Sequence, residues 1–377
     1  MHTFNRTRRF LLPLLAGMLV TTAACPLGRA QSPAPADAQQ QWQQMVDRAV
    51  EYLRVRGQQR DGSFSPQTGI GPTGLVAAGL LSVGTPPNDP VVRKALDYLL
   101  QHVQPDGGIY APDSLHRNYD TCIAIMALSQ ANRDGTYSDV LAKAEKFVKN
   151  LQWDEGEGKT PADVEYGGAG YGSKSRPDLS NTSYLVDALH SLGRGPDDEA
   201  IQKALIFVSR CQNLESPHNT TEFAAKINDG GFYYTVAGGG ESKAGTTPEG
   251  GLRSYGSMTY AGLKSMIYAG VDAQDPRVRA AVDFLRRHYD LESNPGVGRQ
   301  GLFYYYHTMA KALDAFGQPL FADAAGKNHD WRAELRNKLA ELQRPDGSWV
   351  NSTTRWMEGD PNLVTAYALL ALSHCRP

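Results

Sequence analysis

Gln343-Arg344-Pro345-Asp346-Gly347-Ser348-Trp349 has close counterparts elsewhere in the chain. Gln58 to Phe64 and Gln104 to Tyr110 share its pattern of Gln, three variable residues, Gly, one variable residue and an aromatic side chain. Looser versions, with a longer loop, follow Gln152 and Gln212. Recurrence at intervals of this size is typical of proteins built from structural repeats.

Each of these blocks lies between two kinds of helix. The preceding segment is amphipathic, with apolar side chains three and four residues apart, as in Arg48–Leu53, Lys94–Leu99, Lys143–Val148 and Lys203–Val208. The following segment is apolar on all sides and begins with Thr, which can cap the helix or lie in its first turn. We expect these inner helices at Thr73–Val83, Thr121–Gln130, Thr182–Leu192, Thr259–Ala269, Thr308–Phe316 and Thr365–Ser373.

Six apolar helices alternating with six amphipathic ones cannot each be buried within a single hairpin. Closing the hairpins into a ring buries all the apolar helices together. We therefore predict an all-α fold, an (α/α)6 toroid of six helical hairpins in one domain over residues 40–377. An open superhelix of the same hairpins is the alternative.

The repeats resemble the prenyltransferase/squalene oxidase repeat family, which includes squalene cyclases and protein prenyltransferases. Gln343-x-x-x-Gly347-x-Trp349 matches the full repeat motif, and Ser175–Thr182 and Leu252–Thr259 resemble exported bacterial members of the family. The resemblance implies the toroid fold and a central cavity for an isoprenoid-like ligand. We expect the motif's Gln to bond a neighbouring helix and its aromatic ring to cover the hairpin.

The start of each inner helix is the expected place for chemistry, because helix N-termini point into such a cavity with their positive dipole end. Asp120 precedes Thr121 where squalene–hopene cyclases carry D-x-D-D-T, but Tyr119 stands at the proton-donor position. A phenol is a poor acid for an alkene. Asp120 is a catalytic candidate, and capping of its own helix is the structural alternative.

Tyr304-Tyr305-Tyr306-His307-Thr308 resembles the segment of protein prenyltransferase β subunits that supplies a zinc-binding His. Arg253 and Tyr255 occupy the positions of the other ligands in those enzymes, so we expect no zinc and no other cofactor. His307 and Tyr306 are candidates for acid–base roles, since His titrates near neutral pH. A hydrogen-bonded His in the cavity wall is the structural alternative.

Other candidates are polar or aromatic side chains near inner-helix starts. Glu358 and Asp360 are candidate carboxylates for glycoside hydrolysis, and helix capping is the alternative for Asp360. Arg253 can bind a carboxylate or phosphate, or pair with Asp229 or Glu241. The candidate ligand-binding residues are Asn181, Arg253, Tyr255, Tyr304 and Trp356.

Composition limits the possible partners. The 377-residue chain has 38 basic and 40 acidic side chains, so it lacks the positive charge of nucleic-acid-binding proteins. We expect a small-molecule or lipid-like ligand, no nucleic acid, and no transmembrane segment after signal cleavage. Three hypotheses remain open: an isoprenoid-binding toroid, a carbohydrate-active (α/α)6 hydrolase or lyase, and a non-catalytic interaction scaffold.

Residues 1–30 have the pattern of a signal peptide, with Arg6, Arg8 and Arg9 before an apolar run and Gly28-Arg29-Ala30 at the cleavage site. Thr7–Leu12 resembles a twin-arginine export signal, and Thr22–Cys25 weakly resembles a lipoprotein box. We predict export to the periplasm or exterior, followed by a flexible lead-in at residues 31–39.

Overall fold

The computed structural model describes residues 35–172 and 175–377. The predicted signal peptide lies outside the described residues. Helix α1 (Pro35–Tyr52) begins within the segment that we expected to be a flexible lead-in. Its Ala and Gln residues favour the helix, and Pro35 stands at the first helical position, where its missing N–H has no cost.

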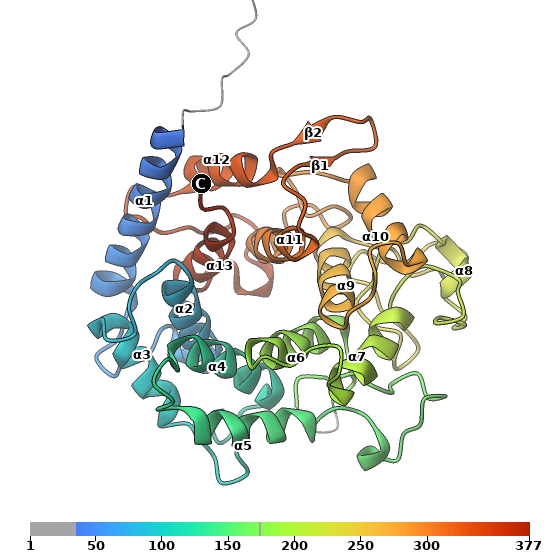
Figure 1. Cartoon of the computed structure of the whole chain (residues 1–377), viewed down its shortest axis with the longest axis horizontal. Coiled ribbons are helices and arrows are strands. Elements are labelled where there is room, and N and C mark those ends of the chain that lie inside the picture. The colour runs from blue at the N-terminus through green and yellow to red at the C-terminus, as the bar shows by residue number, and fades with distance from the viewer. Residues whose placement is uncertain (1–34, 173–174) are drawn as a thin grey trace, which may run out of the picture. The chain divides into compact units, whose positions relative to one another are not determined.

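The inner helices lie around a common centre (Figure 1). Each is buried along most of its length, as expected for a helix that is apolar on all sides. They are α2 (Gly71–Ser82), α4 (Arg117–Ala131), α6 (Leu179–Ser191), α9 (Gly256–Tyr268), α11 (Leu302–Phe316) and α13 (Pro361–Ser373).

The outer helices surround this ring, each with one exposed face. They are α1, α3 (Pro90–Leu100), α5 (Ser138–Lys149), α7 (Glu199–Arg210), α10 (Pro276–Arg287) and α12 (Trp331–Leu342). Inner and outer helices alternate along the chain, and each inner helix packs against the next. Because α13 also packs against α2, the ring is closed, which confirms the toroid and excludes the open superhelix.

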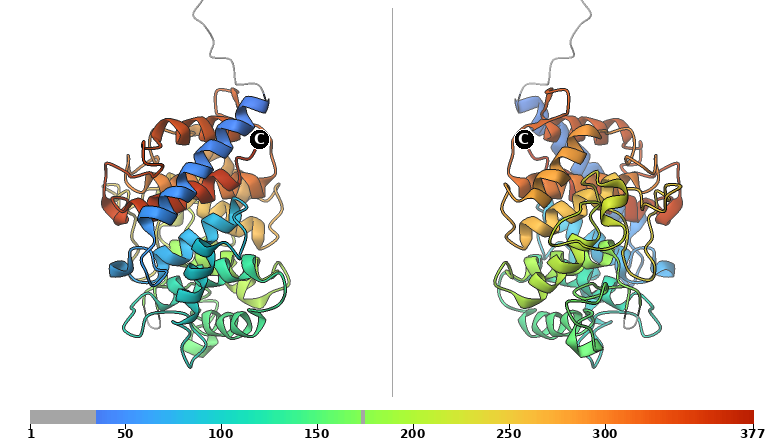
Figure 2. Two further views of the ribbon diagram at one scale, coloured as in Figure 1. Left: turned by 90° about the vertical axis from the view of Figure 1, so that its left-hand side faces the viewer. Right: turned by 90° about the vertical axis from the view of Figure 1, so that its right-hand side faces the viewer.

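The closure joins the two ends of the described chain. Helix α1 lies across α12 and α13 on the outside of the ring (Figure 2). The Trp42 indole donates a hydrogen bond to the Leu372 carbonyl at 2.8 Å, and Gln343 Nε2 donates to the Met45 carbonyl at 2.9 Å. The first outer helix therefore completes the last repeat.

The repeated motif works as a joint between hairpins. Gln343 Nε2 also donates to the Gly347 carbonyl at 2.9 Å, so the side chain ties its own turn to the next outer helix. Gln58, Gln152 and Gln212 each make the same pair of bonds. The predicted role of this Gln is confirmed at these four positions, whereas Gln104 donates to the His102 and Tyr110 carbonyls of its own repeat. The aromatic side chain of the motif is fully buried at Trp349.

The glycine of the motif allows this close approach. Gly347 has φ of +91°, and a Cβ there would stand 2.3 Å from the Arg48 carbonyl oxygen. A side chain at this position would therefore collide with the backbone of the neighbouring outer helix as well as strain its own backbone.

The leading Thr of the inner helices lies inside the first turns rather than at the cap. Thr365 Oγ1 accepts a hydrogen bond from the Trp349 N–H at 3.2 Å, and Thr73 accepts from the Phe64 N–H at 2.9 Å. The helices therefore begin two or more residues before the Thr at which we predicted their start.

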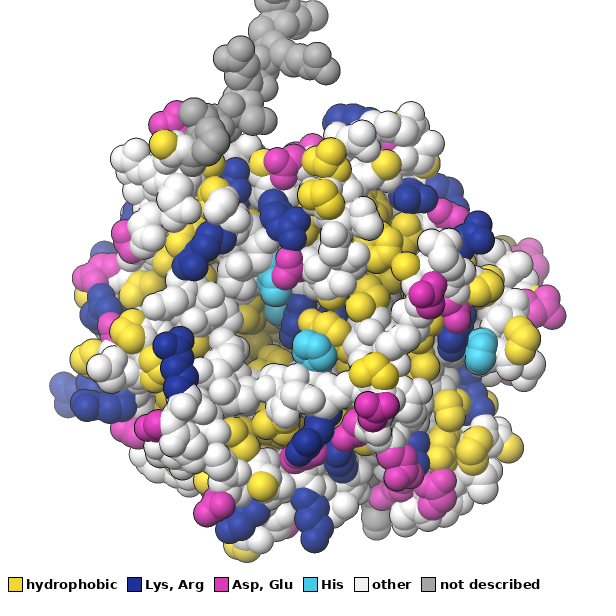
Figure 3. Space-filling model, viewed as in Figure 1, with side chains coloured by type: hydrophobic (Ala, Val, Ile, Leu, Met, Phe, Trp, Pro, Cys, Tyr) yellow, Lys and Arg dark blue, Asp and Glu magenta, His cyan; other side chains and the backbone are white. Residues whose placement is uncertain are grey.

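The remaining elements are short and lie in the connections. They are the helix α8 (Ala224–Ile227), the strands β1 (Phe321–Ala322) and β2 (Asn328–His329), and the turns Leu53–Gly57, Pro66–Thr68, Glu155–Glu157 and Arg355–Met357. Among the described residues, no helix has both the length and the apolarity needed to cross a membrane. The face seen in Figure 3 is hollowed at its centre, with hydrophobic side chains at the base of the hollow.

Candidate functional site

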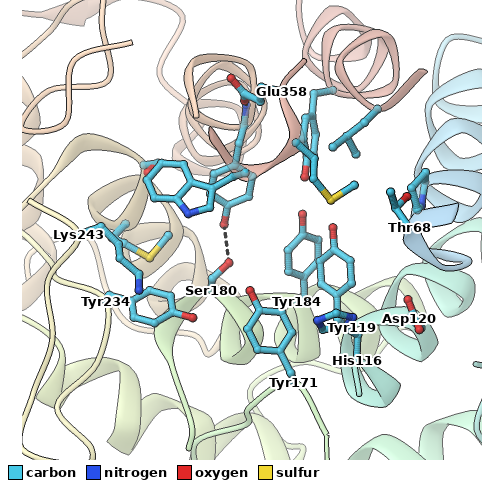
Figure 4. Close-up of a pocket in the computed structure, with 18 of the residues that line it drawn as sticks. Thr68, His116, Tyr119, Asp120, Tyr171, Ser180, Tyr184, Tyr234, Lys243 and Glu358 are labelled. Atoms are coloured by element: carbon cyan, nitrogen blue, oxygen red, sulfur yellow. Dashed lines mark hydrogen bonds between the residues drawn. The ribbon is translucent and has the colours of Figure 1, made fainter. Parts of the chain in front are cut away.

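A cavity of about 400 Å³ lies where the inner helices begin. Aromatic side chains form most of its wall, and Figure 4 shows Asp120 and Lys243 on opposite sides with Tyr171 and Tyr184 between them. Its aromatic lining residues are Tyr119, Tyr171, Tyr184, Tyr234, Tyr255, Tyr304, Tyr367 and Trp356. A volume of this size is within the range of small-molecule sites.

The tyrosine rings of the inner helices contact one another in sequence around the wall. Tyr119 meets Tyr184 edge-to-face with ring centroids 5.0 Å apart, and Tyr304 meets Tyr367 in the same way at 5.8 Å. Tyr304 also bonds the Ser180 hydroxyl at 3.1 Å. Burial raises the pKa of Tyr119 to about 12, so the phenol stays neutral at physiological pH. The wall therefore combines aromatic faces with neutral hydroxyl groups.

Asp120 lines this cavity and faces the start of a neighbouring helix. Its Oδ2 accepts a hydrogen bond from the Ser114 hydroxyl at 2.7 Å, and its carboxylate lies beside the backbone of Gly71, the first residue of α2. Burial raises the pKa of Asp120 to about 6, although the Ser114 hydroxyl and the Gly71 backbone oppose the shift. The alternative that Asp120 caps its own helix is wrong, because Asp120 lies inside the first turn of α4 and the N-cap position is His116.

Glu358 also lines the cavity and serves another helix. Its Oε1 accepts from the Tyr304 N–H at 2.8 Å, at the start of α11, where Gly301 supplies no capping side chain. Its Oε2 accepts from Asn351 Nδ2 at 2.6 Å. Burial raises the pKa of Glu358 to about 7, against the lowering effect of these bonds. Glu358 thus holds the start of α11 in place.

His307 and Tyr306 do not line the cavity. The Tyr306 hydroxyl donates to the Leu291 carbonyl at 2.6 Å, and only Tyr304 of the three consecutive tyrosines reaches the cavity. Successive helical residues point about 100° apart, so three in a row cannot face one space. His307 is buried behind Tyr367, with ring centroids 5.9 Å apart. Burial is the main cause, and the positive charge of Lys311 the next, that holds the pKa of His307 well below its usual value.

Three further candidates lie away from the cavity. Asn181 Nδ2 donates to Asp178 Oδ2 at 2.7 Å within the first turn of α6. Asp360 caps its own helix, α13, by accepting from the Asn362 N–H at 2.8 Å. Arg253 is exposed, and its Nε donates to the Thr246 carbonyl at 3.2 Å, so neither Asp229 nor Glu241 is its partner. Tyr255 and Trp356, in contrast, do line the cavity.

A buried ionic cluster lies between three inner helices. Asp187 of α6 accepts from Lys264 of α9 at 2.6 Å, and Lys311 of α11 lies 3.1 Å from its other oxygen. The side chains of Asp187 and Lys264 are 3% and 2% exposed. Two cations facing one carboxylate lower the pKa of Asp187 to about 2, whereas burial lowers that of Lys264 to about 8.

Sequence reasoning missed five of the tyrosines in the wall as ligand-contacting residues. Tyr184 and Tyr367 both stand two residues after the leading Thr of an inner helix, and this shared position is a signal that could have identified them. Tyr171 and Tyr234 stand in connecting segments that lack any periodicity. No comparable signal marks these residues.

A known protein family matches part of the chain. Residues 73–236 match the family described as "Squalene-hopene cyclase C-terminal domain". Over this stretch the chain is squalene cyclase-like. The match runs from α2 to the segment after α7 and ends before α9, and it confirms the resemblance carried by the repeated motif. A search of curated proteins finds no match.

Solved structures with a similar course of the chain include a protein from Actinoplanes. It has 16% identity and a TM-score of 0.51, over 89% of this chain and 100% of that one. A type II terpene cyclase from Scytonema, in complex with geranylgeranyl dihydroxybenzoate, has 14% identity and a TM-score of 0.33, over 91% of this chain and 99% of that one. At such identities, the likeness to the Actinoplanes protein concerns the fold alone.

Proposed function

We propose that this squalene cyclase-like protein is exported and binds an apolar, isoprenoid-like ligand in its central cavity. The observation that carries the proposal is the wall of seven tyrosines and one tryptophan around about 400 Å³ of space. Aromatic faces pack well against branched hydrocarbon, and the few polar groups among them can orient one end of the ligand. The family match to residues 73–236 also supports a ligand of this class.

No reaction is proposed for this site. The position of the cyclase proton donor is Tyr119, whose phenol holds its proton still more tightly than a free tyrosine does. Glu358 accepts a hydrogen bond from the start of α11 and Asp120 accepts one from the Ser114 hydroxyl, and these bonds account for both carboxylates without catalysis. The same engagement weighs against glycoside hydrolysis, and the open cavity weighs against a purely structural centre.

The test is mass spectrometry of a solvent extract of the purified mature protein. Ser180 lines the cavity, so Ser180→Phe fills part of it without removing core packing. Ser138→Phe, at the exposed start of outer helix α5, is the matched control. We expect a polyisoprenoid in wild type and in Ser138→Phe, and its loss from Ser180→Phe.

An extract without lipid is then followed by titration with geraniol. Binding of geraniol to wild type and to Ser138→Phe, but not to Ser180→Phe, still supports the proposal. If geraniol does not bind wild type, or binds all three proteins equally, the cavity is not an isoprenoid site. A fusion with a reporter enzyme tests export separately, and cytoplasmic retention of the fusion contradicts that part.

A further inference from the structure

A second space adjoins the cavity. This space, the outer groove, lies where the first and last repeats meet, and Thr68 and Met357 line both the groove and the cavity. Thr68 belongs to the turn before α2, and Met357 to the loop before α13. A ligand in the cavity that projects past either residue would therefore enter the groove.

The two spaces differ in chemistry. The cavity is largely aromatic, whereas the groove has a single aromatic residue, Tyr52. Its other side chains are mainly amides and hydroxyls, with one basic and one acidic group. They include Arg56, Gln59, Ser65, Gln67, Asp360 and Asn362. Neutral donors and acceptors with balanced charge suit a hydroxylated group better than a phosphate, for which clustered cations are needed.

Residues with strained backbone conformations also line the groove and the cavity. Four non-glycine residues of the described chain have positive φ, and one of them is Asn228, a residue type that tolerates this conformation. The other three are Ser65 at φ of +50°, Trp356 at +55° and Met357 at +64°. All three line the groove or the cavity. Such strain is concentrated at ligand sites, where the surrounding structure must hold it.

We infer that the ligand is an amphiphile, with its apolar chain in the aromatic cavity and a neutral, hydroxylated head group, such as a sugar, in the outer groove. This inference rests on the proposed function, because the chain must first occupy the cavity. Gln59 and Gln67 are exposed, and no side-chain hydrogen bond within the described protein occupies their amides. Both amides are free to bind the head group.

The experiment compares geraniol with geranyl β-glucoside, which share one chain and differ by the sugar. Calorimetry measures both affinities for wild type and for Gln59→Ala/Gln67→Ala. The matched control is Gln274→Ala/Gln318→Ala, at exposed positions outside both spaces. We expect the glucoside to bind wild type and the control about tenfold more tightly than geraniol, a gain typical of one or two added hydrogen bonds.

The groove variant should lose this tenfold gain while its affinity for geraniol stays unchanged. Equal affinity of wild type for the two compounds overturns the head-group site but leaves the proposed function standing. An equal loss of both affinities in the groove variant also overturns it. If neither compound binds wild type, the proposed function and the inference fail together.

Discussion

The buried cluster of Asp187, Lys264 and Lys311 leads to a prediction about stability. Asp187→Asn keeps the shape of the side chain but removes the carboxylate that faces the two lysines. Lys264 is 2% exposed, so water cannot replace the lost partner. Removing one member of a buried ion pair typically costs about 3–5 kcal/mol, and we expect a loss of this size at pH 7.

The loss should depend on pH in a definite direction. The pKa of Lys264 is about 8 in the folded protein and 10.5 in an unperturbed lysine. Between these values the unfolded chain binds the additional proton, so the contribution of Lys264 to stability rises with pH. At pH 9.5 the buried amine is largely neutral and needs its partner less. The penalty of Asp187→Asn should therefore be smaller there by about 1 kcal/mol or more.

Guanidinium unfolding followed by circular dichroism measures both quantities. Asp314→Asn is the matched control, because Asp314 also pairs with basic groups but its side chain is 43% exposed. We expect the control to lose less than about 1 kcal/mol. Adding Lys264→Met to Asp187→Asn should recover part of the loss by removing a buried charge. A loss below about 1 kcal/mol for Asp187→Asn at pH 7, or one independent of pH, refutes the reasoning.

Four other outcomes follow from the contacts. Gln343→Ala removes one hydrogen bond to α1 and one within the turn of the last repeat, and denaturant unfolding should show a loss of about 1–3 kcal/mol; an unchanged midpoint would show that this Gln does not join the two repeats. Gly347→Val should lower stability in the same assay by at least about 2 kcal/mol; a smaller loss would show that the turn does not need its close approach to the Arg48 backbone. Between pH 4.5 and its pKa of about 7, Glu358 keeps its proton in the folded protein while the unfolded chain ionises, so Glu358→Gln should gain about 1–3 kcal/mol of stability relative to wild type over that range; a constant difference would show that burial does not perturb the group. Arg253→Ala should leave geraniol affinity unchanged, and a clear loss would place Arg253 at the ligand.

The fold was predictable from the sequence because most hairpins repeat the same local rules. The Gln of the motif, its Gly and the leading Thr act within one hairpin and its neighbour, so their spacing determines the architecture without knowledge of the whole. The helix starts were less predictable. The Thr that we took as a possible cap instead binds the N–H of the aromatic position.

The site was predictable only in part, since its wall is assembled from residues far apart in the sequence. Tyr255, Tyr304 and Trp356 were identified because they stand near inner-helix starts. Tyr171 and Tyr234 reach the same wall from loops whose course depends on the closed ring. The capping role of Glu358 depends on a helix from another repeat, which a local pattern does not reveal.

The bond between Trp42 and Leu372 spans almost the whole chain and has a consequence for biosynthesis. A ribosome releases α1 long before α13, so the first outer helix must wait for its partner until α13 has been synthesised. Until then, α2 lacks the neighbour against which it packs in the finished ring. Chaperones would meet an open arc of hairpins with an apolar flank at each end. Truncation near the C-terminus should therefore yield a chain that aggregates, rather than a shorter functional solenoid.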